Sequence, residues 1–219
     1  MSAEMLHSFA ETLSLPLEEK QLSQLFCYSQ CIWDKKDSLN LTSVDNQEEI
    51  FTRHLADGLI AAAKIKQLFT PFPSKELTIA DVGSGAGYIG FTLAIALPHA
   101  QITCVESLEK RCAFMNWAIF KTNISNLRIK KARLGQDPLP QFDVVTERAM
   151  GQLVDILPIC MQAVKPGGFF LAYQGEHPFP QNQPLPAQTI LMNMESYQLP
   201  HSNNKKRHLA LFAKGGVHD

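Results

Sequence analysis

Hydrophobic and polar positions follow two different periods along this chain, and the period changes near residue 70. Up to about Phe69, apolar residues recur every three or four positions, which is the spacing of amphipathic helices. One helical face is formed by Leu22, Leu25, Phe26, Ser29, Ile32 and Trp33. A second face is formed by Ile50, Phe51, Leu55, Leu59 and Ala62. Asp45 or Asn46, followed by Glu48 and Glu49, is a plausible cap for the second helix.

After the two prolines of residues 70–76, short apolar runs alternate with helical stretches. The pattern predicts strands at Leu77–Val82, Gln101–Glu106, Leu127–Lys131, Phe142–Glu147 and Phe169–Gln174. It predicts helices at Tyr88–Leu97, Glu109–Lys121 and Gln152–Val164. Such alternation is typical of an α/β protein with a mostly parallel sheet and helices on both faces.

The last two apolar runs have no helical pattern between them. They cover Gln188–Pro200 and Lys206–Lys214, and they predict an antiparallel hairpin that closes one edge of the sheet. We therefore expect a helical N-terminal extension or lid at residues 1–70 and one α/β domain at residues 71–219.

A glycine-rich turn follows the first predicted strand. It reads DVGSGAGYIG, from Asp81 to Gly90. Tyr88 occupies the place of the third glycine of a dinucleotide fingerprint, and the lysine of a phosphate-binding P-loop is missing. An acid at the strand end would repel a pyrophosphate but suits a cationic ligand. S-adenosylmethionine carries a sulfonium and an ammonium group, so it fits a loop that begins with Asp81.

The acid at the end of the next predicted strand strengthens this interpretation. Glu106 stands where nucleotide-binding relatives of the fold hold the ribose hydroxyls with a carboxylate. Alone, Glu106 could equally be an exposed acid at a strand end. Together, Asp81, Glu106 and the loop glycines Gly83, Gly85 and Gly87 predict an S-adenosyl-L-methionine site.

Charge is unevenly distributed, although the formal net charge is only -1. The stretch from Lys110 to Arg133 carries bases and no acid, and a second basic cluster lies at residues 205–207. A basic face on a neutral body suits a polyanion partner. The alternative is a solvated helix face beside an edge strand protected by lysines.

The five cysteines form no CxxC pair. Cys27 and Cys31 lie one helical turn apart, which could make half of a metal site, but helix packing is the favoured interpretation and no metal is predicted. Free cysteines fit a reducing compartment. The first residues lack the pattern of a signal peptide, and no apolar run is long enough for a membrane span. We expect a cytoplasmic, monomeric protein with no membrane partner.

Several separate motifs in order give a resemblance to a known family. They are NLTSV (Asn40–Val44), RHLAD (Arg53–Asp57), the glycine turn, Glu106-Ser107 with Lys110-Arg111, ERA (Glu147–Ala149) and RHL (Arg207–Leu209). Together they resemble the glucose-inhibited division protein B family. That resemblance implies a class I, Rossmann-like, seven-stranded methyltransferase that uses S-adenosylmethionine to methylate guanine N7 in 16S ribosomal RNA, alone or in the 30S subunit.

The resemblance also implies roles for single residues. Gly83 and Tyr88 would contact the cofactor, Leu134 and Gly135 would line its adenine, and Arg148 would face the methyl-transfer pocket. The chain departs from the family pattern at Ile89, Gly135 and Gln174, where a proline, an acid and a lysine are usual.

Substrate contacts are expected on two sides. Arg53, His54 and Asp57 would be the wall of the acceptor pocket, or else polar contacts that hold a lid helix. The predicted RNA contacts are Arg53, Lys110, Arg111, Lys130, Lys131, Arg207 and His208, although the last two could simply be polar residues of an edge strand. The aromatic residues Trp33, Phe114 and Trp117 are expected in the core.

Guanine N7 has a free lone pair and no proton, so its methylation needs positioning and no general base. The absence of a catalytic triad or a carboxylate pair in the sequence is therefore compatible with catalysis. Two other functions stay open at this point. One is a methyltransferase for a small molecule or a protein, and the other is a non-catalytic module that binds the cofactor or RNA.

Overall fold

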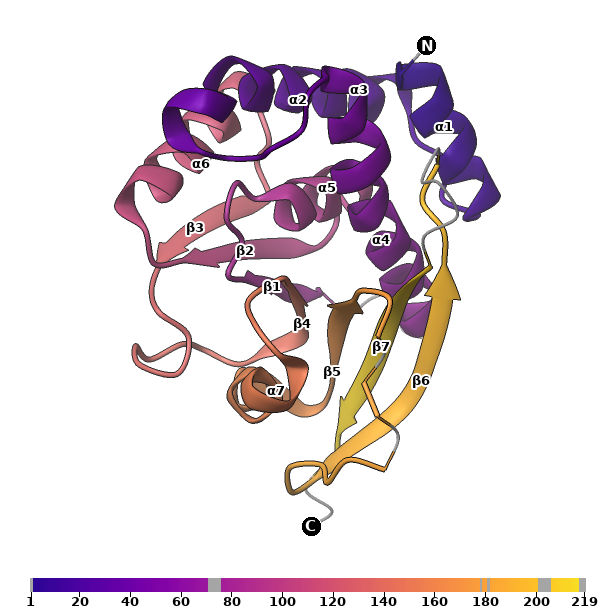
Figure 1. Ribbon diagram of the computed structural model, residues 1–219, viewed down its shortest axis with the longest axis vertical. Coiled ribbons are helices and arrows are strands. Elements are labelled where there is room, and N and C mark those ends of the chain that lie inside the picture. Colours follow the sequence, from indigo (N-terminus) through magenta and orange to yellow (C-terminus); the bar gives the residue numbers. More distant parts are fainter. Residues whose placement is uncertain (1, 71–75, 178, 181, 201–205, 217–219) are drawn as a thin grey trace.

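The computed structural model describes residues 2–70, 76–177, 179–180, 182–200 and 206–216. One sheet runs through the molecule, with helices on both of its faces (Figure 1). The strands are β1 (Thr78–Val82), β2 (Gln101–Glu106), β3 (Leu127–Lys131), β4 (Phe142–Arg148), β5 (Val164–Gln174), β6 (Thr189–Tyr197) and β7 (Arg207–Lys214). The helices are α1 (Ser2–Thr12), α2 (Glu19–Leu39), α3 (Gln47–Glu49), the π-helix η1 (Ile50–Leu55), α4 (Ala56–Phe69), α5 (Tyr88–Ala96), α6 (Glu109–Thr122) and α7 (Leu153–Gln162).

The strand order is β3-β2-β1-β4-β5-β7-β6. The first five of these strands pair in parallel, whereas β7 is antiparallel to both β5 and β6. The predicted C-terminal hairpin and the mostly parallel seven-stranded sheet are therefore confirmed. Within the hairpin, β7 is the inner strand and β6 forms the edge.

The two faces of the sheet bury two separate apolar cores, because successive side chains of a strand point to opposite faces. Val144 of β4 belongs to the core beneath α1, α2, α4, α5 and α6, and its neighbour Val145 belongs to the core beneath α7. Figure 1 shows α7 on the side of the sheet opposite the other helices. Covered faces explain why the central strands β1 and β2 are largely buried, whereas the edge strand β3, LRIKK, is mostly exposed.

The predicted cap of the second N-terminal helical region is confirmed at Asn46, whose side chain accepts a hydrogen bond from the Glu49 N–H at 3.0 Å. Periodicity did not predict the π-helix that follows directly. In η1 the hydrogen bonds skip one residue more than in an α-helix, as between the Ala56 N–H and the Phe51 carbonyl. Segments of this kind are common at functional sites.

Two details of the sequence prediction are wrong. Phe26 is 48% exposed, so it is not part of the buried face of α2. The helix predicted through Val164 ends at Gln162, and Val164 instead begins β5 by pairing with Phe142. The register shifts after that pair and accommodates Pro166 and Gly167 within the strand. Gly167 has a φ of +75°, so this segment forms a bulge within β5, and pairing with β4 resumes at Phe169.

No helix in the described part of the chain is long and apolar enough to cross a bilayer. The five cysteines all lie in described segments and are all free. Cys27 donates to the Lys121 carbonyl at 3.4 Å, which places it at the contact between α2 and α6.

Gly90 allows a close approach between α5 and β2. A Cβ atom at this position would lie 2.1 Å from the Cys104 Sγ. We predict that Gly90→Ala lowers the free energy of unfolding by about 1–3 kcal/mol, although alanine is the better helix former. Urea unfolding measures this change. The double variant with Cys104→Ala should recover part of the loss, and equal costs in both backgrounds would contradict the assigned clash.

Candidate active site

The carboxyl ends of β1, β2 and β4 meet at one edge of the sheet. β1 lies between the other two, and the chain leaves it toward β2 before returning on the other side as β4. This point, where the strand order reverses, is where open α/β sheets form a crevice outside the strand ends. A pocket of about 170 Å³ lies there, lined by residues that include Asp81, Gly85, Tyr88, Arg111 and Arg148.

Three glycines of the loop after β1 have left-handed backbone angles. Their φ values are +64° at Gly83, +62° at Gly85 and +90° at Gly87. Only glycine adopts such angles without strain. A Cβ at Gly83 would strike the Met150 side chain at 2.2 Å, whereas one at Gly85 would meet nothing within 4 Å. The backbone at Gly85 is therefore bare on its pocket side, and a ligand can approach it closely.

Asp81 lies at the end of β1 beneath this loop and is only 2% exposed. Its carboxylate accepts hydrogen bonds from the Gly90 N–H at 3.1 Å and from the Thr146 hydroxyl at 3.0 Å. Burial raises the pKa of Asp81 to about 6, against the opposing effect of these hydrogen bonds. Because Asp81 lines the pocket, its charge faces whatever binds there.

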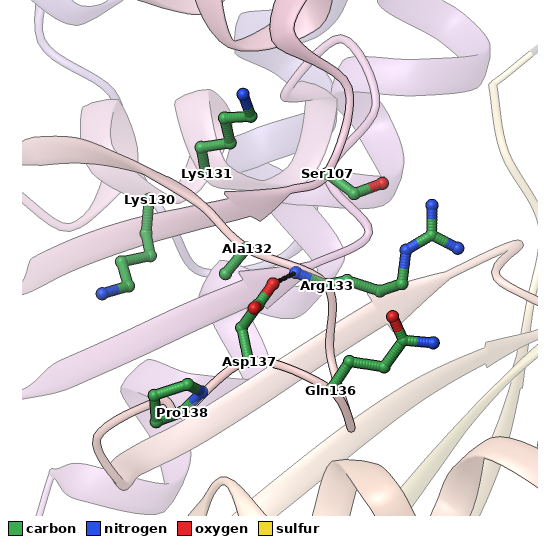
Figure 2. Close-up of a pocket in the computed structure, with 8 residues that line it drawn as sticks. All are labelled: Ser107, Lys130, Lys131, Ala132, Arg133, Gln136, Asp137 and Pro138. Carbon is green, nitrogen blue, oxygen red and sulfur yellow. Dashed lines mark hydrogen bonds between the residues drawn. The ribbon is translucent and has the colours of Figure 1, made fainter.

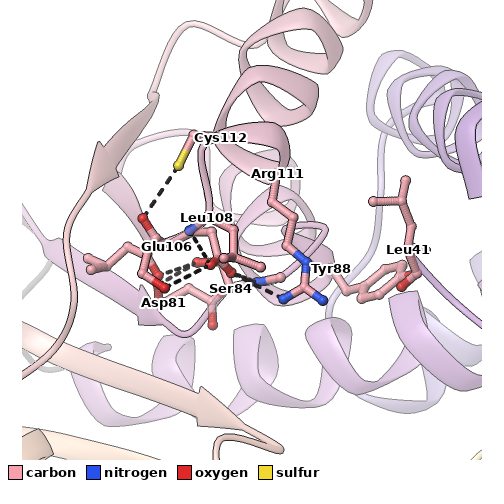
Figure 3. A network of polar contacts seen from close by, with 11 residues as sticks. Leu41, Asp81, Ser84, Tyr88, Glu106, Leu108, Arg111 and Cys112 are labelled. Carbon is pink, nitrogen blue, oxygen red and sulfur yellow. Dashed lines mark hydrogen bonds and ion pairs between the residues drawn. The ribbon is translucent and has the colours of Figure 1, made fainter. Parts of the chain in front are cut away.

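Glu106 ends β2 on the other side of the loop (Figure 3). Its carboxylate accepts from the Gly85 N–H at 2.9 Å and from the Leu108 N–H at 2.8 Å. The Arg111 guanidinium lies 3.6 Å from the same group. Glu106 is thus fixed at the border of the pocket, and Arg111 lies inside the site instead of on an open basic face.

A second pocket, of about 420 Å³, adjoins the first. It is lined by Arg148, Ala149, Gly151, Tyr173, Gln174, Gly175, Glu176, Tyr197, Lys206 and Arg207. Arg148 and Ala149 line both pockets. Ala149 has a φ of +65°, an unusual angle for a residue with a Cβ and one that is typical of functional sites.

A single residue, Asp57, accepts hydrogen bonds from four side chains of this second pocket, three at its carboxylate and one at its backbone carbonyl. Asp57 of α4 is fully buried. Its Oδ2 accepts from Arg148 at 2.9 Å and from Arg207 at 2.7 Å, and its Oδ1 accepts from the Tyr197 hydroxyl at 2.8 Å. The Tyr173 hydroxyl donates to the Asp57 carbonyl at 2.8 Å. These four side chains come from β4, β7, β6 and β5, so Asp57 joins the strands to the helical region.

The ring of Tyr88 lies between a histidine and an arginine. His54 stacks on it with 4.1 Å between ring centroids, and the Arg148 guanidinium lies 5.1 Å from the ring centroid. Burial lowers the pKa of His54 to about 2, and Arg148, Arg53 and Arg207 add to this shift. His54 is therefore neutral, with its Nε2 at 2.9 Å from the Thr42 hydroxyl.

Comparison with known proteins decides the family. A sequence model of the GidB family, described as rRNA small subunit methyltransferase G, matches residues 21–210. The chain belongs to the GidB family. One relative, the ribosomal RNA small subunit methyltransferase G of Polaromonas naphthalenivorans, is 33% identical over 87% of this chain and 86% of its own length. The protein of that name from Bacillus cereus strain AH187 is 29% identical over 98% of this chain and 91% of its own length.

Solved structures confirm the fold class of this GidB-family chain. The magnesium protoporphyrin IX methyltransferase of Synechocystis PCC 6803, determined with bound SAH, superposes with a TM-score of 0.58. The match covers 90% of this chain and all of that one at 12% sequence identity. The architecture is therefore that of a class I methyltransferase.

Leu134 and Gly135, for which the resemblance implied adenine contacts, do not line the pocket of the glycine loop. They line a separate pocket of about 390 Å³ with Ile159 and Gln162. A Cβ at Gly135 would lie 2.8 Å from the Ile159 side chain. Their proposed contact with the cofactor stays a prediction.

The basic residues of β3 border a further pocket of about 490 Å³ (Figure 2). Its lining includes Lys130, Lys131, Arg133 and Ser107. Figure 2 shows the Lys130 and Lys131 side chains leaving β3 in opposite directions. Lys131, Lys130 and Lys110 are all exposed, and Lys131 pairs with Glu109. The structure thus distributes the basic stretch over more than one surface.

The remaining predicted substrate contacts, Arg53, His54, Asp57 and His208, do not line the two pockets. Arg53 is half-exposed and pairs with Glu49 at 2.7 Å. His208 donates from Nδ1 to the Gly175 carbonyl at 2.9 Å, beside the second pocket. Of the expected wall residues Arg53, His54 and Asp57, none lines either pocket of the site. Asp57 and His54 lie behind the wall and hold its side chains.

Sequence reasoning missed Tyr173, Tyr197 and Glu176, which line the second pocket together with Lys206 of the predicted basic cluster. No spacing rule relates them, because they come from the ends of separate strands and from a turn. Within the described residues, no group of three or more His, Cys, Asp or Glu side chains is arranged to hold a metal ion.

Because Asp57 is buried, leaving its charge unpaired is unfavourable. Removing that charge is unfavourable as well, because its partners then lack a counter-charge. We predict that Asp57→Asn lowers the free energy of unfolding by about 3–5 kcal/mol, because Arg148 and Arg207 lose their shared counter-charge. Denaturant unfolding gives this value. Glu195→Gln, which breaks a surface ion pair with Lys64, is the matched control and should cost less than about 1 kcal/mol. Equal costs for the two variants would contradict the role assigned to Asp57.

Proposed function

We propose that this chain transfers a methyl group from S-adenosylmethionine to N7 of a guanine in 16S ribosomal RNA. Membership of the GidB family supports the reaction class and the ribosomal RNA substrate. The observation that carries the proposal is a pair of adjoining pockets that share Arg148 and Ala149. One pocket suits a cationic methyl donor, and the other suits a base as acceptor.

The donor pocket fits the cofactor by charge and by shape. Asp81 supplies a negative charge for the ammonium group, and the bare backbone at Gly85 allows the methionine part to lie against the loop. Glu106 is held at the border by the Leu108 N–H and would accept hydrogen bonds from the ribose hydroxyls. We assign the nucleoside end to the 490 Å³ pocket lined by Ser107 and Ala132, because Ser107 directly follows Glu106 in the chain.

When bound, the cofactor supplies a methyl group whose bond to sulfur breaks as the guanine N7 lone pair bonds to carbon, leaving the electron pair on sulfur. N7 carries no proton, so no side chain has to remove one. The neutral, enclosed His54 agrees with this requirement. What the chain must supply is alignment, which is worth up to about 7–11 kcal/mol in favourable cases.

Arg148 is the residue best placed to align the acceptor. Its Nη1 donates to Asp57, and the opposed effects of burial and of that carboxylate leave its pKa raised, so it is charged. A guanidinium has five N–H donors. We assign the donors that Asp57 does not use to guanine O6 or to a phosphate oxygen, with N7 left free toward the donor pocket.

The RNA backbone would contact exposed basic side chains, of which Lys130 and Arg133 line the 490 Å³ pocket. Lys110, Lys130, Arg133 and Lys206 are exposed, and the last of these lines the acceptor pocket. Contacts of this kind make affinity fall steeply with salt. A methyltransferase that acts on small molecules or proteins would not require these basic side chains. No comparison favours that alternative.

Labelled cofactor tests the function directly. The purified chain is incubated with methyl-labelled S-adenosylmethionine and 30S subunits, or free 16S RNA, from cells that lack this protein. We expect label at one guanine, mapped by chemical cleavage specific for N7-methylated guanine. Label on another atom would overturn the N7 assignment, and label on protein alone would overturn the substrate class. Cofactor binding without transfer would favour a non-catalytic module.

The raised pKa of Asp81 predicts a pH dependence of cofactor affinity. The ionised carboxylate binds the ammonium group, so affinity should be highest above about pH 6 and decrease as the pH falls below that value. The expected loss is roughly tenfold per pH unit at most. Calorimetry with S-adenosylhomocysteine from pH 8 to 5 measures it. Asp81→Asn should bind weakly with a flat profile, and a flat profile in the wild type would contradict the assigned role.

A further inference from the structure

The acceptor pocket is lined by more positive side chains than negative ones. Arg148, Lys206 and Arg207 supply the positive groups, and Glu176 is the one acid among its lining residues in the described chain. Asp57 does not change this count for a substrate, because it is fully buried and already accepts from Arg148, Arg207 and Tyr197. Among the described lining residues, Glu176 is therefore the one carboxylate that can accept from a donor on a bound base.

Glu176 is exposed, and among the described residues its carboxylate has neither a hydrogen bond nor an ion pair. The turn that carries it is nevertheless fixed. The Gly175 carbonyl accepts from His208 at 2.9 Å, and the Gln174 amide donates to the Tyr173 carbonyl at 2.9 Å. The contact of His208 thus fixes the residue before Glu176, and the Glu176 side chain lines the pocket with its oxygens open to a ligand.

Guanine is the base that matches such a pocket. It presents the acceptors O6 and N7 on one edge and the donors N1–H and N2–H on its pairing edge. A carboxylate accepts two parallel N–H groups well, as in charge-assisted pairs with arginine. Adenine presents a lone pair at N1 and has no amino group at C2, so it would set an acceptor against the carboxylate and leave it without partners.

We propose that Glu176 accepts hydrogen bonds from N1–H and N2–H of the acceptor guanine and is the specificity-determining residue of the pocket. This inference rests on the proposed function. The arginines then take O6, and N7 points to the donor pocket. Because the pairing edge is occupied by protein, the target guanine must be unpaired, as in a loop or when turned out of a helix.

An inosine substitution isolates the contact. Inosine differs from guanosine only in lacking the N2 amino group. Once the methylated position is mapped, 16S RNA is ligated with guanosine or inosine at that single position. The ratio of kcat/KM for the two RNAs is then measured for the wild-type chain, for Glu176→Gln and for the control Glu19→Gln, an exposed acid of α2.

We expect the wild type and Glu19→Gln to prefer guanosine by roughly 10-fold or more, which is the range for a hydrogen bond to a charged group. Glu176→Gln should lose roughly 10-fold or more on guanosine, and its preference should fall to about 1–3-fold. Its affinity for S-adenosylhomocysteine and its unfolding midpoint should match the wild type, because Glu176 is exposed and lies outside the donor pocket.

An unchanged guanosine-to-inosine ratio in Glu176→Gln would overturn the inference, even with a lower overall rate, because a structural role would affect both RNAs alike. Equal rates of the wild type on both RNAs would overturn it as well. In either case methylation of guanine still stands. If the wild type methylates no guanine at all, the proposed function itself is wrong and the inference falls with it.

Discussion

The buried carboxylate of Asp57 is the contact on which the site depends. Burying an unpaired charge costs several kcal/mol, so the Asp57 carboxylate is stable in this buried position only when its partners contact it. Arg148 and Arg207 supply the opposite charge, and Tyr197 supplies a further hydrogen bond. The same contacts fix the direction of both guanidiniums. Electrostatics, as well as apolar packing, therefore sets where α4 lies against the strand ends.

What could be predicted from the sequence is what local geometry encodes. The glycines after β1 have left-handed backbone angles, and acids stand where the apolar runs end. The glycine loop and the two acids Asp81 and Glu106 could therefore be recognised from the sequence. The family motifs added the reaction class. The error at Val164 has a different origin, because the pairing of Val164 with Phe142 in the neighbouring strand is not encoded in the local sequence.

The acceptor pocket could not be predicted in this way. The residues that contact Asp57 are separated from it by 91 positions at Arg148, 116 at Tyr173, 140 at Tyr197 and 150 at Arg207. No periodicity relates positions so far apart. The motif RHLAD did indicate that Asp57 matters, but the sequence could not show that it supports the pocket from behind.

The two pockets also differ in the sequence separation of the residues whose contacts form them. The loop contact between Gly85 and Glu106 spans 21 residues, whereas that between Asp57 and Arg207 spans 150. Closing the longer span costs more chain entropy, and it needs the β6–β7 hairpin in place. A molecule whose hairpin has locally opened would therefore retain the contact between Gly85 and Glu106 but lose the contacts of Arg207 and Tyr197 with Asp57. Under the proposed function, such a molecule would bind the methyl donor without positioning the acceptor base.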